Sequence, residues 1–166
     1  MGRPDRRGTR TTPVPIRSVG HTEGEARSDE CGDHRRSAGG SAVIYLDTSA
    51  AAKLLIDEAE SEAVAELFER GAEFVSSRLL AVELAAIVDR RLIAGHDVQQ
   101  VIDRVALVSL DDDIADAAIA LRSGLRTLDA LHLATALRLG TAVDGILTFD
   151  LELRARAEHH GLAAVL

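Results

Sequence analysis

The chain has 166 residues, of which 46% are hydrophobic and 28% are charged. This length predicts one domain, or one domain with a tail, and the apolar fraction excludes a wholly disordered chain. No segment approaches the roughly 18 consecutive apolar residues of a membrane-spanning helix. The single cysteine, Cys31, excludes an intramolecular disulfide and a cysteine-based zinc site. The net charge of −8 argues against binding nucleic acid through a basic surface alone.

Residues 1–41 differ in composition from the rest of the chain. They hold all three prolines and seven of the 13 glycines, carry a net charge of +2, and show no hydrophobic period. Such a segment cannot bury enough apolar surface to offset the entropy of ordering it, so we predict a disordered tail. Its simplest explanation is a start codon assigned too early or an expression scar. Because it lacks the apolar stretch of a secretory signal, we expect a cytoplasmic protein whose folded part is 42–166, with a net charge of −10.

Strand and helix patterns alternate along residues 42–166. Short apolar runs with β-branched or aromatic residues predict strands over 42–46, 74–76, 107–110, 145–149 and 162–166. Apolar residues at helical spacing predict helices over 50–56, 59–70, 79–93, 98–106, 112–122, 128–139 and 151–160. We expect capping of the helices that follow by Thr48 or Ser49, Asp97 and Thr127. The alternation favours an α/β fold, with three layers around a mainly parallel central sheet.

Two aspartates directly follow predicted strands. Asp47 comes after the strand 42–46, and Asp150 comes after the strand 145–149. Ligands of open parallel sheets bind beyond the carboxyl ends of the strands, so both side chains are expected in one crevice if these strands are neighbours. The alternative interpretation is that each aspartate only caps the helix that follows it.

Two further acids stand on helices that are otherwise apolar. Glu83 lies within the apolar stripe of the helix 79–93, where an unpaired carboxylate is costly, unless Arg78 or Arg126 pairs with it. Asp129 lies in the first turn of the apolar helix 128–139, where the helix dipole also favours an acid. His132, one turn further on, is interpreted as a satisfied core histidine rather than a metal ligand.

Four acids from four separate elements near one crevice repel one another unless a cation lies among them. Hard oxygen ligands, without cysteine or paired histidine, suit Mg²⁺ or Mn²⁺ and disfavour zinc. The sequence contains no GxxxxGK[ST], GxGxxG after a strand, GxSxG or HExxH motif. P-loop nucleotide hydrolysis, dinucleotide redox chemistry, serine esterase chemistry and zincin proteolysis are therefore not favoured.

The acids lie in four segments that together resemble the PIN-domain family, and within it the VapC toxins of bacterial VapBC toxin–antitoxin pairs. The segments are Val43–Ala50 with LDTSA, Ala81–Leu84, Leu125–Ala136 with TLDALHLATA, and Leu147–Asp150. The resemblance implies a PIN-like α/β/α sandwich over 42–166 and an Mg²⁺- or Mn²⁺-dependent endoribonuclease. By position, the family's acidic quartet corresponds to Asp47, Glu83, Asp129 and Asp150. Its supporting polar positions correspond to Thr48 or Ser49, and to Thr148.

The same resemblance implies how the site works and with what. Asp47, Asp129 and Asp150 would hold the metal that activates water against an RNA phosphodiester, with Glu83 assisting. Because the folded part is acidic, we expect backbone contacts from nearby arginines, with Arg78, Arg122 and Arg126 as candidates. The family implies a VapB-type antitoxin and a homodimer as partners, and no membrane.

Three other functions remain open from the sequence. A PIN-like binding module without cleavage would use the acids only for structure. A Mg²⁺-dependent phosphatase of the haloacid dehalogenase type also begins with an aspartate at a strand end, but it needs a second acid two residues on, where Ser49 stands. A nuclease directed at DNA is the third.

Overall fold

A computed structural model describes residues 41–91 and 95–166. Its centre is a four-stranded sheet, formed by β1 (Val43–Leu46), β2 (Glu73–Ser77), β3 (Val105–Val108) and β4 (Gly145–Leu147). The strand order is β3-β2-β1-β4, and every neighbouring pair is parallel. β1 thus lies between β2 and β4. The chain continues from β1 to β2 and β3 along one edge of β1, and later returns so that β4 pairs with the other edge. This arrangement confirms the predicted parallel sheet.

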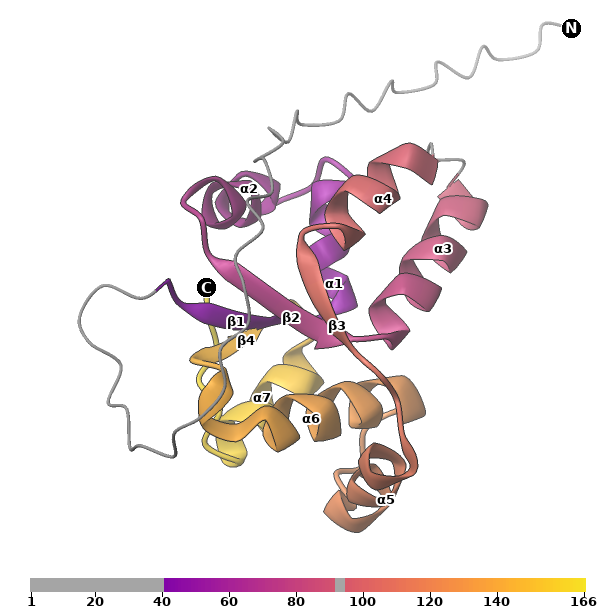
Figure 1. The fold of residues 1–166 in the computed structure, drawn as a ribbon, viewed down its shortest axis with the longest axis vertical. Helices are drawn as coiled ribbons and strands as arrows, with labels where there is room; N and C mark the ends of the chain where they lie inside the picture. The colour runs from indigo at the N-terminus through magenta and orange to yellow at the C-terminus, as the bar shows by residue number, and fades with distance from the viewer. Residues whose placement is uncertain (1–40, 92–94) are drawn as a thin grey trace, which may run out of the picture.

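Helices cover both faces of the sheet (Figure 1). One face carries α1 (Thr48–Ala51), which continues as the 3₁₀ turn η1 (Ala52–Leu54), with α2 (Ser61–Glu69), α3 (Leu79–Arg91) and α4 (Gly95–Ile102). The other face carries α6 (Thr127–Leu139) and α7 (Leu151–His159); α5 (Asp112–Leu121) packs on α6, and the turn η2 (Gly140–Ala142) follows α6. The predicted three-layer α/β fold is therefore confirmed.

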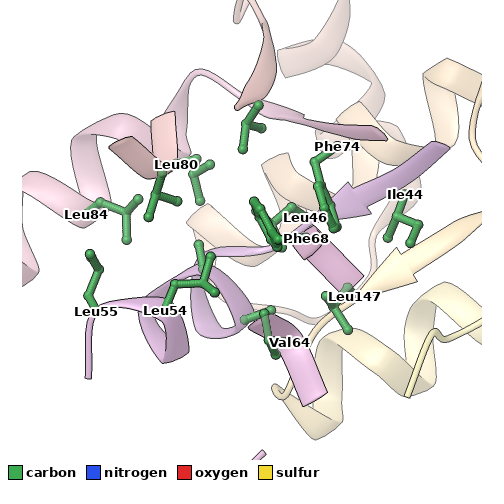
Figure 2. Packing of buried hydrophobic residues seen from close by; sticks show 14 of the residues in the cluster. Ile44, Leu46, Leu54, Leu55, Val64, Phe68, Phe74, Leu80, Leu84 and Leu147 are labelled. Atoms are coloured by element: carbon green, nitrogen blue, oxygen red, sulfur yellow. The ribbon is translucent and has the colours of Figure 1, made fainter. Parts of the chain in front are cut away.

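The alternation of side chains along β1 divides the core into two clusters. Ile44 and Leu46 point toward the α1–α4 face, where they join Phe68, Phe74 and Leu80 (Figure 2). Phe68 and Phe74 stack there with ring centroids 3.9 Å apart. Tyr45, between them in sequence, points to the opposite face and joins a second cluster, which includes Leu133, Ile146 and Leu153. Each fully buried Leu or Phe contributes about 1.5–3 kcal/mol, so both layers are held mainly by apolar packing.

The C-terminal strand predicted over 162–166 is wrong as a full strand. The chain there forms one parallel bridge, between Ile146 and Ala164. Two backbone bonds hold it, from the Ile146 N–H to the Ala163 carbonyl (2.8 Å) and from the Val165 N–H to the Ile146 carbonyl (2.9 Å). The neighbouring strand β4 has only three residues, so it cannot support a longer ladder. Gly145 permits this close approach, because a Cβ there would lie 2.7 Å from the Ala163 carbonyl oxygen.

The predicted helix caps need three corrections. α1 begins at Thr48, and its cap is Asp47, since a carboxylate at this position accepts a charge-assisted bond from the Ser49 N–H. Asp97 lies inside the first turn of α4, which already begins at Gly95. Thr127 is the first residue of α6, and its cap position makes no side-chain hydrogen bond; burial of the middle of this helix holds it instead.

The predicted disordered tail, 1–41, lies outside the described residues except for Ser41. Within residues 41–91 and 95–166, no helix is both long and apolar enough to cross a membrane.

Candidate active site

Asp47 and Asp150 lie at the carboxyl ends of the adjacent strands β1 and β4. The backbone N–H of Asp47 donates to the Leu147 carbonyl at 3.0 Å, which ties the two strand ends together. Both aspartates also cap the helices that follow them, as the alternative interpretation expected. Asp150 Oδ1 accepts bonds of 2.9 Å from the N–H groups of Glu152 and Leu153. Capping and convergence are therefore compatible, because each cap occupies only one carboxylate oxygen.

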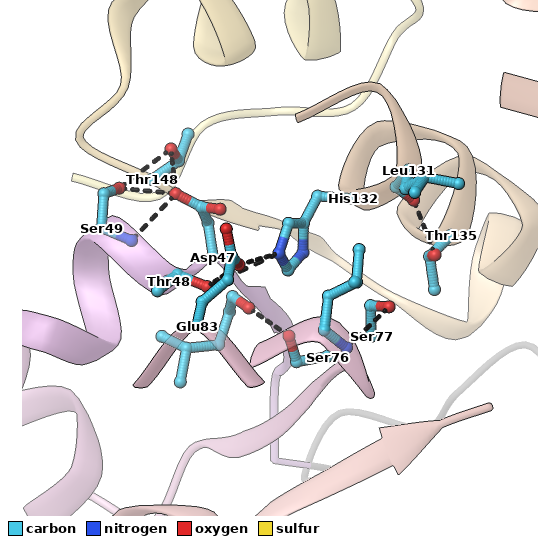
Figure 3. A network of polar contacts seen from close by, with 12 residues as sticks. Asp47, Thr48, Ser49, Ser76, Ser77, Glu83, Leu131, His132, Thr135 and Thr148 are labelled. Carbon is cyan, nitrogen blue, oxygen red and sulfur yellow. Dashed lines mark hydrogen bonds and ion pairs between the residues drawn. The ribbon is translucent and has the colours of Figure 1, made fainter. Parts of the chain in front are cut away.

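Thr148 and Ser49 hold the Asp47 side chain in place (Figure 3), and Thr148 also contacts Asp150. Asp47 Oδ2 accepts bonds from the Ser49 hydroxyl (2.6 Å), the Ser49 N–H (3.1 Å) and the Thr148 hydroxyl (2.9 Å). The Thr148 oxygen in turn accepts a bond from the Asp150 N–H at 3.1 Å. Thr148 thus connects the side chain of one aspartate to the backbone of the other.

Glu83 reaches the same region from α3 and meets α1 and α6. Its Oε2 atom accepts a bond of 2.5 Å from the Thr48 hydroxyl and lies 2.8 Å from His132 Nε2 (Figure 3). The alternative in which Arg78 or Arg126 pairs with Glu83 is wrong: both arginines are exposed, and neither pairs with Glu83 among the described residues. Partial burial opposes ionisation of Glu83, but the bonds from His132 and Thr48 and the charge of His132 hold its pKa below the usual value.

His132 is buried and fully bonded, as the interpretation of a satisfied core histidine expected. It is 1% exposed, and its Nδ1 atom lies 2.8 Å from the Tyr45 hydroxyl. The apolar pattern of the strand 42–46 does not mark Tyr45 as a residue of the site. Burial raises the pKa of Tyr45, as does the nearby charge of Asp47. A polar atom at a fully buried strand position was the one signal that could have pointed to a partner.

Asp129, in the first turn of α6, completes the group of acids. Its pKa is raised first by partial burial and then by the negative charges of Asp150, Asp47 and Glu83, while His132 partly offsets them. Hydrogen bonds bring Asp47, Asp150 and Glu83 to one region, and Asp129 lies one turn before His132, which bonds to Glu83.

The chemistry of these donors suits a hard divalent cation. Within the described part of the chain, no side chain bonds to the second oxygen of Asp47, Asp150 or Glu83, or to either oxygen of Asp129. Among the described residues, no group of three or more His, Cys, Asp or Glu side chains is placed to hold a metal ion, so the structure contains no preformed protein cage for one. Mg²⁺ needs no such cage, since one or two carboxylates commonly hold it together with water and substrate phosphates. Oxygen donors with mutual repulsion thus fit this group, with some coordination left to solvent.

Comparison with known proteins agrees with this geometry. A family model described as PIN domain matches residues 44–159, which include all four acids. The chain belongs to the PIN-domain family.

Its sequence relatives are ribonucleases of the VapC type. Ribonuclease VapC46 of Mycobacterium tuberculosis is 36% identical over 126 residues, covering 75% of this chain and 97% of that protein. Ribonuclease VapC35 of the same species is 36% identical over 129 residues, covering 74% of this chain and 96% of that protein.

Solved structures share the fold of this PIN domain at lower sequence identity. M. tuberculosis VapC20, described as a toxin that cleaves the sarcin–ricin loop, superposes with a TM-score of 0.55 at 17% identity, covering 68% of this chain and 93% of that one. PAE2754 from Pyrobaculum aerophilum gives 0.53 at 17% identity, covering 76% of this chain and 88% of that one. At these identities the likeness supports the fold alone.

Proposed function

We propose that this PIN domain is a divalent-metal-dependent endoribonuclease, the toxin of a VapBC-type toxin–antitoxin pair. One observation supports the proposal most: Asp47 and Asp150 stand at the ends of the adjacent strands β1 and β4, joined through Thr148, and Glu83 is bonded to Thr48 beside them. The negative charges of these three acids also raise the pKa of Asp129. The relatives named as VapC ribonucleases cover the same part of the chain. Cleavage of phosphodiester bonds is the chemistry that such an acidic cluster serves.

In this mechanism, Asp47, Asp129 and Asp150 would hold the cation, for which we propose Mg²⁺ with Mn²⁺ as a substitute. When bound, such an ion activates water and neutralises charge on the phosphate. Ser49 and Thr148 fix one oxygen of Asp47 and leave the other for the ion. Glu83, kept ionised by its bonds to Thr48 and His132, would orient the attacking water and accept its proton.

The RNA backbone needs positive charge beside this acidic site. Arg126 directly precedes α6, which carries Asp129, and Arg122 lies at the start of the same loop. The Arg156 guanidinium lies beside Gly124 in this loop, 3.8 Å from where a Cβ would stand. No described acid pairs with these three exposed arginines, whereas Arg70, Arg91, Arg138 and Arg154 all have acidic partners. We therefore propose that Arg122 and Arg126 contact phosphates of the substrate, with Arg78 as a further candidate.

The partners follow from the same family. We propose a VapB-type antitoxin and a homodimer in the cytoplasm, where cellular RNA is the substrate. The exposed apolar side chains of Val82 (65% exposed) and Ile119 (74% exposed) support burial by another chain. Light scattering of the purified protein, alone and with the product of a neighbouring antitoxin-sized reading frame, tests both partners.

Cleavage of matched RNA and DNA oligomers, with and without Mg²⁺, tests the proposed function. We expect metal-dependent cutting of RNA by the wild type and none by Asp129→Asn. Preferential cutting of DNA would support the alternative of a nuclease directed at DNA. Turnover of a chromogenic phosphomonoester without RNA cleavage would support the phosphatase alternative. Unchanged RNA turnover in both Asp47→Asn and Asp129→Asn would leave the acids only a structural role.

A further inference from the structure

A chain of hydrogen bonds runs from the interior of the protein to Glu83. The Ser77 N–H donates to the Tyr45 hydroxyl oxygen at 3.2 Å. The Tyr45 hydroxyl lies 2.8 Å from His132 Nδ1, and His132 Nε2 lies 2.8 Å from Glu83 Oε2. Tyr45 and His132 are 0% and 1% exposed, so water does not compete for these bonds. A polar chain sealed in this way fixes the orientation of each of its members.

The directions of these bonds fix the tautomer of His132. The Glu83 carboxylate only accepts hydrogen bonds, so the proton between it and His132 is on Nε2. The Tyr45 hydroxyl, whose oxygen accepts from the Ser77 N–H, can then donate to Nδ1. In the neutral ring, Nδ1 is the acceptor and the proton is on Nε2. In the charged ring, whose charge lowers the pKa of Glu83, Nε2 also carries a proton. His132 therefore donates from Nε2 to Glu83, and a flipped ring or the other tautomer would lose one of the two bonds.

The proposed chemistry uses Glu83 but assigns nothing to Tyr45 or His132. We infer that Tyr45 and His132 are positioning residues, which hold Glu83 Oε2 through the His132 Nε2–H so that the other oxygen of Glu83 faces the acidic cluster. Thr48 adds a second donor to the same oxygen, at 2.5 Å. Glu83 comes from a different helix than Asp129, so without this chain only Thr48 would restrain its side chain. The inference rests on the proposed nuclease function for its kinetic consequence, but not for its structural one.

The first test is kinetic and removes one atom. Tyr45→Phe keeps the buried ring and deletes the hydroxyl that fixes His132. We expect kcat for RNA cleavage to fall between about tenfold and a hundredfold, with KM unchanged, because a misplaced group costs catalysis rather than substrate binding. The matched control is Ser61→Ala, which also removes a buried hydroxyl with two hydrogen bonds, but in α2 and away from the site. Its kcat is expected to equal that of the wild type.

A double-mutant cycle separates positioning from general destabilisation. In a Glu83→Gln background, Tyr45→Phe should cause no further loss of kcat, because both changes act through the same carboxylate. Losses that multiply, or an unchanged kcat in the single variant, would overturn the inference. A wild type that cuts no RNA at all would refute the proposed function instead, and would leave the next measurement unaffected.

The second test needs neither activity nor a metal. Nitrogen NMR of the uniformly labelled wild-type protein reports which ring nitrogen of His132 carries the proton. At a pH where the ring is neutral, we expect the Nε2–H tautomer alone, and its loss or mixing with the other form in Tyr45→Phe. The Nδ1–H tautomer in the wild type would overturn the inference, even if the Tyr45 variant did not fold.

Discussion

The Thr148 hydroxyl joins Asp47 to Asp150, so its removal tests how the site is held together. Thr148→Val keeps the shape of this 2% exposed side chain but deletes the bond to Asp47 Oδ2 and the acceptor of the Asp150 N–H. A bond to a charged group contributes about 1.5–3 kcal/mol, and an unsatisfied buried donor costs about 1–3 kcal/mol. Asp47 Oδ2 retains both bonds from Ser49, and water can reach the half-buried Asp150. We therefore expect a net loss of about 2–4 kcal/mol.

Two assays measure this change in Thr148→Val. In thermal unfolding, about 2–4 kcal/mol lowers the midpoint of a domain of this size by roughly 6–15 °C. In RNA cleavage assays run well below that midpoint, kcat should fall by more than about tenfold over a range of metal concentrations, because two groups that would hold the metal lose their fixed spacing. Thr148→Ser, which keeps the hydroxyl, is the matched control and should retain most of the thermal stability and most of kcat. Equal midpoints and equal kcat values for Thr148→Val and Thr148→Ser would show that the hydroxyl does not organise the site.

Three other predictions follow from the charges of the site. The pKa of Asp129 is raised in the folded state, so the contribution of this group to stability falls as pH rises through that pKa. In metal-free protein at pH 7, Asp129→Asn should therefore raise the thermal midpoint, while it abolishes RNA cleavage. The gain in midpoint should vanish near pH 4. The pKa of Glu83 is lowered in the folded state, so its contribution to stability is present at neutral pH and is lost as pH falls through the folded pKa. Glu83→Gln should therefore lower the thermal midpoint at pH 7. A midpoint that moves in the same direction in Glu83→Gln and Asp129→Asn would contradict this account. If Arg122 and Arg126 bind phosphates, replacing both by Ala in an Asp129→Asn background should reduce the slope of log affinity for RNA against log salt by about 1.4, at about 0.7 per contact; Arg138→Ala, which breaks only a pair with Asp113, should leave the slope unchanged.

The position of the acids along the elements could be predicted from the sequence. Asp47 and Asp150 follow short apolar runs, and such runs mark buried parallel strands because both of their faces are covered. Their convergence could only be stated conditionally, because it depends on β1 and β4 being neighbours. That pairing brings together residues about a hundred positions apart, and no local pattern encodes it.

The polar contacts within the site were harder to predict. Tyr45 in an apolar strand and His132 on an apolar helix both suggest core packing, and only the fold brings them to 2.8 Å. The partner of Glu83 was missed for the same reason, since an arginine is the commoner partner of a buried acid. The cap of α6 could not be predicted, because this helix is held by burial and not by a capping bond, which a local pattern cannot show.

Anomalous scattering from crystals soaked in Mn²⁺ tests the central claim most directly. The account predicts a Mn²⁺ peak among the free oxygens of Asp47, Asp129 and Asp150 in the wild type, and none there in Asp129→Asn. A wild-type protein that cleaves RNA while its Mn²⁺ lies elsewhere, or that places no metal at these carboxylates, would contradict it.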